Sequence, residues 1–108
     1  MSQFKLSGKT AIVTGANGGI GRGIALALAE AGANICLAGR NNQKNEKVRA
    51  EIEGLSKPVI AQSCDVNDDA SIAETIEATI DAFGNLDILV NNAGIVSLNS
   101  PEAVTDAE

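Results

Sequence analysis

Short apolar runs alternate with longer amphipathic stretches along this chain, and the alternation restricts the fold more than any other feature of the sequence. The four runs cover residues 10–14, 34–38, 58–63 and 86–90, and they have the length and composition of buried strands. More than about a dozen residues separate each run from the next, which is the separation that parallel strands require. We therefore predict the order β-α-β-α-β-α-β, with one parallel sheet covered by helices on both faces.

The three stretches between the runs repeat their apolar residues every three or four positions, which predicts one apolar face for each helix. The predicted faces are Ile20, Ile24, Leu28 and Ala31 in the first helix, Val48, Ile52 and Leu55 in the second, and Ile72, Ile76, Ile80 and Phe83 in the third. Asp68 and Asp69 are expected to open the third helix, since carboxylates there cap free backbone amides. A chain of 108 residues is long enough for one such domain and too short for two.

The junction between the first strand and the first helix is rich in glycine. Its residues are Thr14, Gly15, Ala16, Asn17, Gly18, Gly19, Ile20 and Gly21. Glycine permits a turn with positive φ and lets a ligand approach bare backbone, while the first turn of the helix adds unpaired amides that attract a pyrophosphate. Because the cluster follows a strand and opens a helix, we predict that residues 15–21 bind a dinucleotide. The chain has no Gly-Lys-Ser/Thr sequence, which argues against a P-loop.

The residues after the second strand bear on the choice between NAD and NADP. A cofactor with a free ribose 2′-hydroxyl is usually met there by a carboxylate, but the sequence reads Ala38-Gly39-Arg40-Asn41. The guanidinium of Arg40 would pair with a 2′-phosphate, so we predict NADP in preference to NAD. The alternative is that Arg40 is a surface charge in a loop. We interpret Arg22, in the first helix, as a solvated or interface residue.

The charge distribution restricts the partners. The formal charge is -6, and every Lys and Arg lies between Lys5 and Lys57, so the second half of the chain carries acids only. Such a half repels polyanions, and we expect no nucleic acid partner. We also expect a cytoplasmic protein outside membranes, since no apolar run could cross a bilayer and the start lacks a signal-peptide core. Cys36 and Cys64 are predicted to be buried free thiols, because they lack a metal-binding spacing and the chain has no His.

Three motifs together resemble those of the short-chain dehydrogenase/reductase family. They are Thr14-Gly15, Gly19 and Gly21 for its TGxxxGxG cofactor motif, Asp65 and Val66 for its acidic pair after the third strand, and Asn91, Asn92, Ala93 and Gly94 for its NNAG motif. The resemblance implies that Asp65 holds the adenine amino group, while Val66 supplies a backbone contact and an apolar wall. It also implies that Asn92, Ala93 and Gly94 approach the ribose of the nicotinamide.

The resemblance extends over about residues 6–96 and implies a Rossmann-type doubly wound parallel sheet of order 3-2-1-4, truncated after the fourth strand. We accordingly divide the chain into a dinucleotide-binding portion, residues 1–96, and a polar tail, residues 97–108, that leads into a missing remainder. The fourth strand would form an edge of this sheet, and an unpaired apolar edge tends to aggregate. We therefore expect the chain to be the amino-terminal part of a longer enzyme.

The catalytic Ser, the Tyr-x-x-x-Lys pair and the active-site Asn of the family all follow the point at which this chain stops, and the chain contains no Tyr. No catalytic residue is therefore assigned, and we expect the chain to bind the cofactor only. The resemblance implies that the parent protein, as a homodimer or homotetramer, transfers a hydride between C4 of NADP or NAD and an alcohol or carbonyl substrate. The alternative is a stand-alone dinucleotide-binding or interaction module without catalysis.

Overall fold

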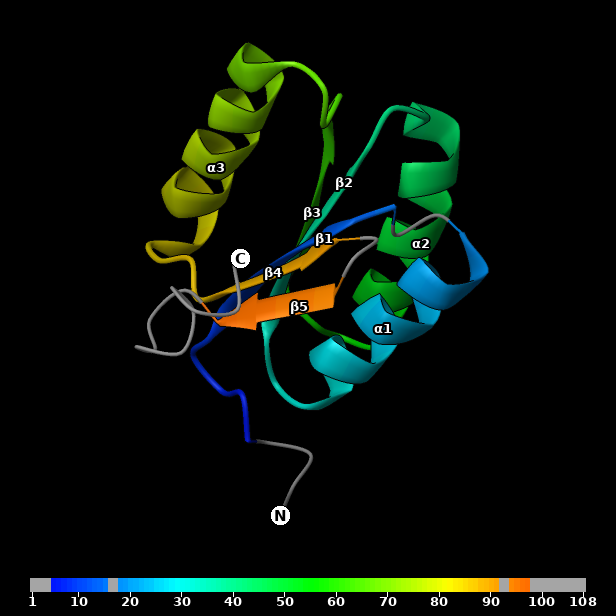
Figure 1. Cartoon of the computed structure of the whole chain (residues 1–108). Helices are drawn as coiled ribbons and strands as arrows, with labels where there is room; N and C mark the ends of the chain where they lie inside the picture. The colour runs from blue at the N-terminus through cyan, green and yellow to red at the C-terminus, as the bar shows by residue number, and fades with distance from the viewer. Residues whose placement is uncertain (1–4, 16–17, 92–93, 98–108) are drawn as a thin grey trace.

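The computed structural model describes residues 5–15, 18–91 and 94–97, which form a sheet between two layers of helix (Figure 1). The elements are β1 (Thr10–Thr14), α1 (Gly19–Glu30), β2 (Asn34–Gly39), α2 (Asn42–Gly54), β3 (Val59–Ser63), α3 (Asp69–Phe83), β4 (Ile88–Asn91) and β5 (Gly94–Ser97). The helices α1 and α2 cover one face of the sheet, and α3 lies on the other. The predicted alternation of strands and helices is thus confirmed as far as β4.

The strand order is β3-β2-β1-β4-β5, and the first four strands are parallel. The predicted parallel order 3-2-1-4 is therefore confirmed. We expected β4 to form the sheet edge, whereas the structure adds β5, which pairs with β4 in the antiparallel sense and sets Gly94 opposite Asn91. The physical reason is that an apolar strand presents free backbone groups along its outer side, and the chain folds back after β4 to pair with them.

Small residues of α1 pack against the sheet. Ala25 and Ala29 are fully buried, and Ile24 and Leu28 are half-buried beside them. The predicted face of α1 is wrong at its first position, because Ile20 is 83% exposed at the start of the helix. Alanine adds little to an apolar pattern, yet its small side chain fills the interface where a helix lies close to a sheet.

Helix α2 packs on the same face of the sheet. Val48 and Ile52 are buried as predicted, whereas Leu55 lies beyond the last helical residue and is exposed. Asn45 takes the third buried position, and its Nδ2 donates a hydrogen bond to the carbonyl oxygen of Gly39 at 2.9 Å. This bond explains why a polar side chain occupies the core there, since buried polar groups require partners.

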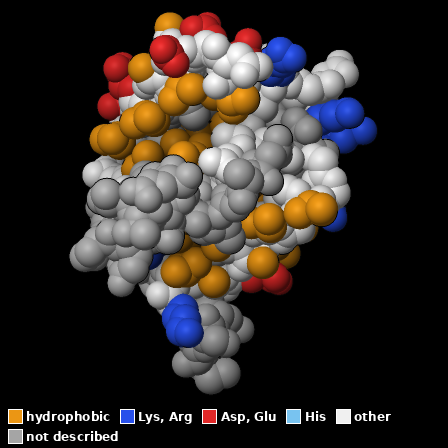
Figure 2. Space-filling model, in the orientation of Figure 1, with side chains coloured by type: hydrophobic (Ala, Val, Ile, Leu, Met, Phe, Trp, Pro, Cys, Tyr) orange, Lys and Arg blue, Asp and Glu red, His pale blue; other side chains and the backbone are white. Residues whose placement is uncertain are grey.

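Helix α3 buries two threonines that the apolar pattern did not predict, while the predicted Ile72 is half-buried against the core as expected. Thr75 and Thr79 are buried, and their hydroxyls donate to the carbonyl oxygens of Ser71 and Thr75 at 2.9 and 2.7 Å. Ile76 and Ile80 are exposed, and Figure 2 shows apolar side chains at the surface beside the acids of α3. Bonds to the preceding helical turn satisfy the hydroxyls, which lets threonine enter the core where an apolar pattern predicts isoleucine.

Two predictions about individual side chains are confirmed on this side of the sheet. Asp68 is the N-cap of α3, and its Oδ1 accepts a hydrogen bond from the amide of Ala70 at 3.1 Å. Cys36 and Cys64 are free and buried. Burial raises the pKa of the Cys36 thiol above its ordinary value, so this thiol stays protonated near neutral pH and packs as a small apolar group.

A buried polar network joins β1, β2 and β4 at the amino ends of the strands. The Asp87 carboxylate accepts hydrogen bonds from the amide of Thr10 at 3.0 Å and from Asn85 Nδ2 at 2.7 Å. The Thr10 hydroxyl donates to Asn85 Oδ1 at 2.8 Å and accepts from Asn34 Nδ2 at 3.1 Å. Because Asp87 is buried, its bond to the Thr10 amide is shielded from water and gains strength, while the other three bonds of the network are partly buried.

We predict that Asp87→Ala lowers the free energy of unfolding by about 2 to 3 kcal/mol, because the buried amide of Thr10 loses its carboxylate acceptor. Urea unfolding followed by circular dichroism measures the change. The matched control is Asp81→Ala, which removes an exposed acid on α3 and should change stability by less than about 0.5 kcal/mol. Equal unfolding midpoints for the two variants would contradict the role given to the network.

Candidate functional site

The carboxyl ends of β1, β2 and β3 meet at one end of the sheet (Figure 1). A pocket of about 330 Å³ opens there. It is lined by residues 14–15, 38–41, 44 and 64–67. These residues come from the carboxyl ends of β1 and β2, from the connections that follow the three strands, and from the first turn of α2. The parallel pairing therefore assembles the pocket from segments that lie far apart in the sequence.

The glycine turn begins the pocket. Gly15 has φ of +65°, a conformation that side-chain-bearing residues rarely adopt, and its amide donates to the carbonyl oxygen of Ala38 at 3.1 Å. The carbonyl oxygen of Gly15 accepts from the amide of Gly18, the N-cap of α1, at 3.1 Å. A Cβ at Gly19 would meet no atom of the described residues within 4 Å, so packing against that part of the chain does not require a glycine there. The close approach of a ligand to the bare backbone would explain the glycine at position 19, which internal packing does not explain.

The predicted residues of the glycine turn do not all reach the pocket. Gly15 lines it, whereas Ile20 is exposed and Gly21 is half-buried in the first turn of α1. Ala16 and Asn17 lie outside the described residues.

Arg40 and Asp65 face each other across the pocket. Arg40 Nη1 lies 3.9 Å from Asp65 Oδ2, and the Arg40 side chain is 72% exposed. An exposed ion pair at this distance contributes little to stability, so the guanidinium is free to exchange partners. Val66 lines the pocket with a largely exposed apolar side chain. Arg40 and the pair Asp65 and Val66, which were predicted from separate parts of the sequence, are thus brought together with Gly15.

Hydrogen bonds fix the loop that carries Asp65. The amide of Asp65 donates to Ser71 Oγ at 2.9 Å, and its Oδ1 accepts from the amide of Asn67 at 2.9 Å. The amide of Cys64 donates to the carbonyl oxygen of Gly39 at 3.0 Å and extends the pairing between β2 and β3. One carboxylate oxygen of Asp65 is therefore engaged with its own loop, while the other faces Arg40.

A hollow with mainly apolar walls adjoins the pocket between α3 and the sheet. Its volume is about 390 Å³, and Ile12, Ile72 and Leu89 line it together with residues shared with the pocket, among them Thr14 and Cys64. The two spaces share Thr14, Ala38, Cys64 and Val66 in their walls, and the hollow reaches Asn91 at the end of β4. The prediction for Asn92 and Ala93 falls outside the described residues, and Gly94 lies at the start of β5 next to this end of β4.

A family model described as short chain dehydrogenase matches residues 9–108 of the chain. The chain belongs to the short chain dehydrogenase family. A short chain dehydrogenase/reductase of Aspergillus oryzae is 44% identical over 103 residues, which cover 94% of this chain and 39% of that protein. Among solved structures, a hydroxysteroid dehydrogenase from Escherichia coli has a TM-score of 0.80 and 35% identity, with 94% of this chain and 43% of that chain covered.

A third similar protein bears on the cofactor. A short chain dehydrogenase/reductase from Burkholderia phymatum, solved in complex with NAD, has a TM-score of 0.75 and 29% identity, with 82% of this chain and 31% of that chain covered. This short chain dehydrogenase chain spans 20% to 40% of the length of curated relatives that it matches.

Two residues that shape the site were not predicted from the sequence, one in the β2–α2 connection and one in α2. Asn41 is the N-cap of α2, and its Oδ1 accepts from the amide of Lys44 at 2.9 Å. Asn45 ties the same turn to Gly39. An Asn directly before a polar helical stretch is a recognised capping signal, so Asn41 could have been identified, whereas the burial of Asn45 depends on the tertiary structure.

Arg22 lies outside the pocket. It donates from Nε to Glu51 Oε1 at 2.7 Å and from Nη2 to Oε2 of the same residue, which links α1 to α2. The hydrogen bonds from Arg22 hold the pKa of the Glu51 carboxyl below its ordinary value. Arg22 is thus a partly exposed side chain that joins two helices of the same chain.

Residues 5–15, 18–91 and 94–97 contain no group of three or more His, Cys, Asp or Glu side chains that could hold a metal ion. None of the described helices is long and apolar enough to cross a membrane.

We predict that Gly15→Ala lowers the free energy of unfolding by about 1 to 2 kcal/mol, because alanine is strained at φ of +65°. The matched control is Gly23→Ala, on an exposed position of α1 where a Cβ would meet no atom within 4 Å. That variant should gain about 0.5 to 1 kcal/mol, since glycine weakens a helix interior. Thermal and urea unfolding of both variants measure the difference, and a Gly15→Ala protein as stable as the parent would contradict the strained turn.

Proposed function

We propose that this chain is the cofactor-binding part of an NADP(H)-preferring oxidoreductase, which transfers a hydride between the nicotinamide C4 and an alcohol or carbonyl substrate. The observation that carries the proposal is the pocket at the carboxyl ends of β1, β2 and β3, in which Gly15, Arg40 and Asp65 meet. In parallel sheets, ligands bind at this edge where the strand order reverses, and here the order reverses between β1 and β4. The cofactor supplies the hydride chemistry, and the residues of this chain bind and orient the cofactor.

Each part of the cofactor has a partner of matching chemistry. The turn at Gly15 and the amino end of α1, from its N-cap Gly18 to Gly21, suit the pyrophosphate. Asp65 offers an acceptor for the adenine amino group, and Val66 offers an apolar wall. We assign residues 92–94 to the ribose of the nicotinamide on the family motif.

The preference for NADP over NAD rests on Arg40. The residues at the end of β2 include no carboxylate that could accept from a ribose 2′-hydroxyl, and an exposed guanidinium follows them. A 2′-phosphate would form a charge-assisted contact with that guanidinium. The NAD complex of the similar Burkholderia protein supports the general class of cofactor. NAD is therefore the alternative cofactor, and the affinities for NADPH and NADH are compared.

The activity of the whole protein is proposed from its relatives. The chain has neither Tyr nor His, and no residue of it is assigned to proton transfer. The names of the relatives describe reductases and dehydrogenases of small molecules, which supports an alcohol or carbonyl substrate. We also propose a cytoplasmic location and a homodimer or homotetramer of the longer protein.

The proposal is tested by titrating the purified protein with NADPH and NADH and following the nicotinamide fluorescence. Saturable binding of both, with NADPH bound more tightly, is expected. A protein that binds neither cofactor would refute the function. Cofactor binding without oxidation of any alcohol by the longer protein would favour the non-catalytic module.

We predict that Arg40→Ala weakens NADPH binding about tenfold and changes NADH binding by less than about twofold, because only NADPH carries the 2′-phosphate. The same fluorescence titration measures both affinities. The matched control is Arg49→Ala, which removes an Arg of α2 that pairs with Glu46 and Glu53 and does not line the pocket. Equal losses of the two cofactors in Arg40→Ala would remove Arg40 as the selector.

A further inference from the structure

Lys44 lines the same pocket as Arg40, although no sequence motif singled it out. It lies in the first turn of α2, one helical turn after Arg40. The cap from Asn41 to the Lys44 amide fixes this turn, and the bond from Asn45 to Gly39 fixes the turn to the end of β2. The two basic side chains therefore start from a rigid connection on one side of the pocket.

The charges around Lys44 are unbalanced. No described residue forms an ion pair with its ammonium, and the first turn of α2 contains no acid. Asp65, the acid among the described residues that line the pocket, faces Arg40. A lysine in the first turn is also unfavourable, because the amino end of a helix carries a partial positive charge. An anion bound beside Lys44 and Arg40 would offset this excess of positive charge.

We propose that Lys44 is a second cation of the 2′-phosphate subsite and, together with Arg40, determines the preference for NADP(H). The inference deepens the proposed function and rests on it. A phosphate monoester carries close to two negative charges near neutral pH and has three acceptor oxygens, so it can engage two cations at once. NAD has a hydroxyl in place of this phosphate and offers Lys44 no charge to pair with.

Lys44 could instead contact the pyrophosphate, which NAD and NADP share. The two arrangements differ in their consequence for selectivity. A contact with the pyrophosphate would affect both cofactors equally, whereas a contact with the 2′-phosphate affects NADP(H) alone. Selectivity, rather than affinity, is therefore the quantity to measure.

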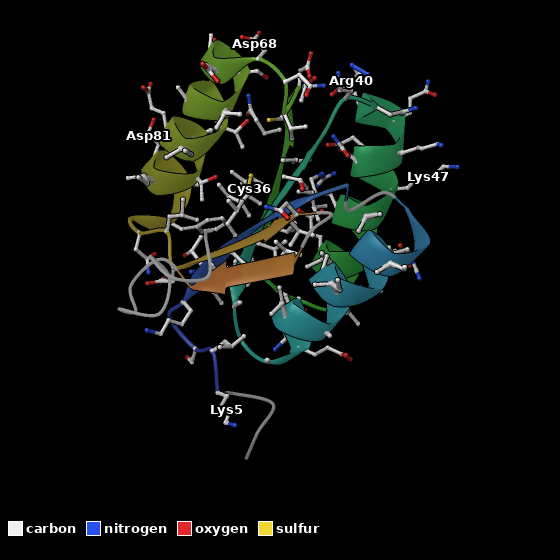
Figure 3. The ribbon with its side chains drawn as sticks, in the orientation of Figure 1. Lys5, Cys36, Arg40, Lys47, Asp68 and Asp81 are labelled. Atoms are coloured by element: carbon white, nitrogen blue, oxygen red, sulfur yellow. The ribbon has the colours of Figure 1, made fainter. Side chains whose placement is uncertain are left out.

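The test is Lys44→Gln, which keeps a side chain of similar length and removes the charge. The matched control is Lys47→Gln, because Lys47 lies on the same helix but outside the pocket, and Figure 3 shows it pointing away from the sheet. In Lys44→Gln, NADPH binding should weaken about fivefold to tenfold and NADH binding should change by less than about twofold. Lys47→Gln should change each affinity by less than about twofold. Thermal unfolding verifies that both variants fold.

Two nucleotides without a nicotinamide give an independent measurement. Adenosine 2′,5′-bisphosphate and 5′-AMP differ only in the 2′-phosphate, and calorimetric titration gives their affinities for the parent protein and for Lys44→Gln. The parent should bind the bisphosphate more tightly, and the substitution should reduce this difference about fivefold or more.

The outcomes separate the inference from the proposed function. A parent protein that binds NADPH, with a Lys44→Gln variant that loses NADPH and NADH equally or loses neither, would overturn the inference and leave the function standing. A parent that binds neither cofactor would overturn both. A selective loss of NADPH and of the bisphosphate would confirm the role of Lys44.

Discussion

The parallel pairing of β1, β2 and β3 is the constraint on which the rest of the structure depends. In this pairing Thr14 lies opposite Ala38, and Gly39 lies opposite Ser63, so the residues that follow each strand emerge side by side. Parallel strands require crossover connections, here helices, and each helix returns the chain to the end of the sheet at which the strands begin. The pairing consequently brings together Gly15, Arg40 and the loop with Asp65, although they lie far apart in the sequence.

The two ends of the sheet differ in how their polar groups are buried and paired. The amino ends are closed by the buried network around Asp87, which joins three strands through side chains. The carboxyl ends carry exposed polar loops, and the ion pair between Arg40 and Asp65 is loose and solvated. The buried side-chain bonds therefore lie at the amino ends of the strands, and the polar groups at the carboxyl ends are left available to bind a ligand.

The fold was largely predictable, because the signals that specify it are local. Four apolar runs predicted the parallel strands, and glycine with the Asp68 cap predicted where helices begin. The buried helix faces were predicted less well, since Thr75 and Thr79 enter the core only after their hydroxyls bond to the helix itself. The strand β5 was not predicted, because its formation depends on pairing with the outer side of β4 rather than on its own composition.

The candidate site also contains some residues that the sequence predicts and others that only the tertiary structure places. Arg40 and Asp65 could be selected because each directly follows an apolar strand, where the carboxyl edge must lie. Lys44 could not be selected, because its position depends on the cap of α2 and on the bond that ties Asn45 to β2. A polar helix such as α2 gives no indication in its sequence of which lysine faces the pocket and which faces solvent.

The central claim is that the carboxyl edge of the sheet binds the dinucleotide. The most direct test is to titrate the isotopically labelled protein with NADP⁺ and follow its backbone amides by nuclear magnetic resonance. We expect shifts at Gly15, Arg40 and Asp65, and none at Thr10 or Asp87 at the opposite edge. Shifts confined to that opposite edge or to the exposed side of α3, or no shifts at all, would contradict the account.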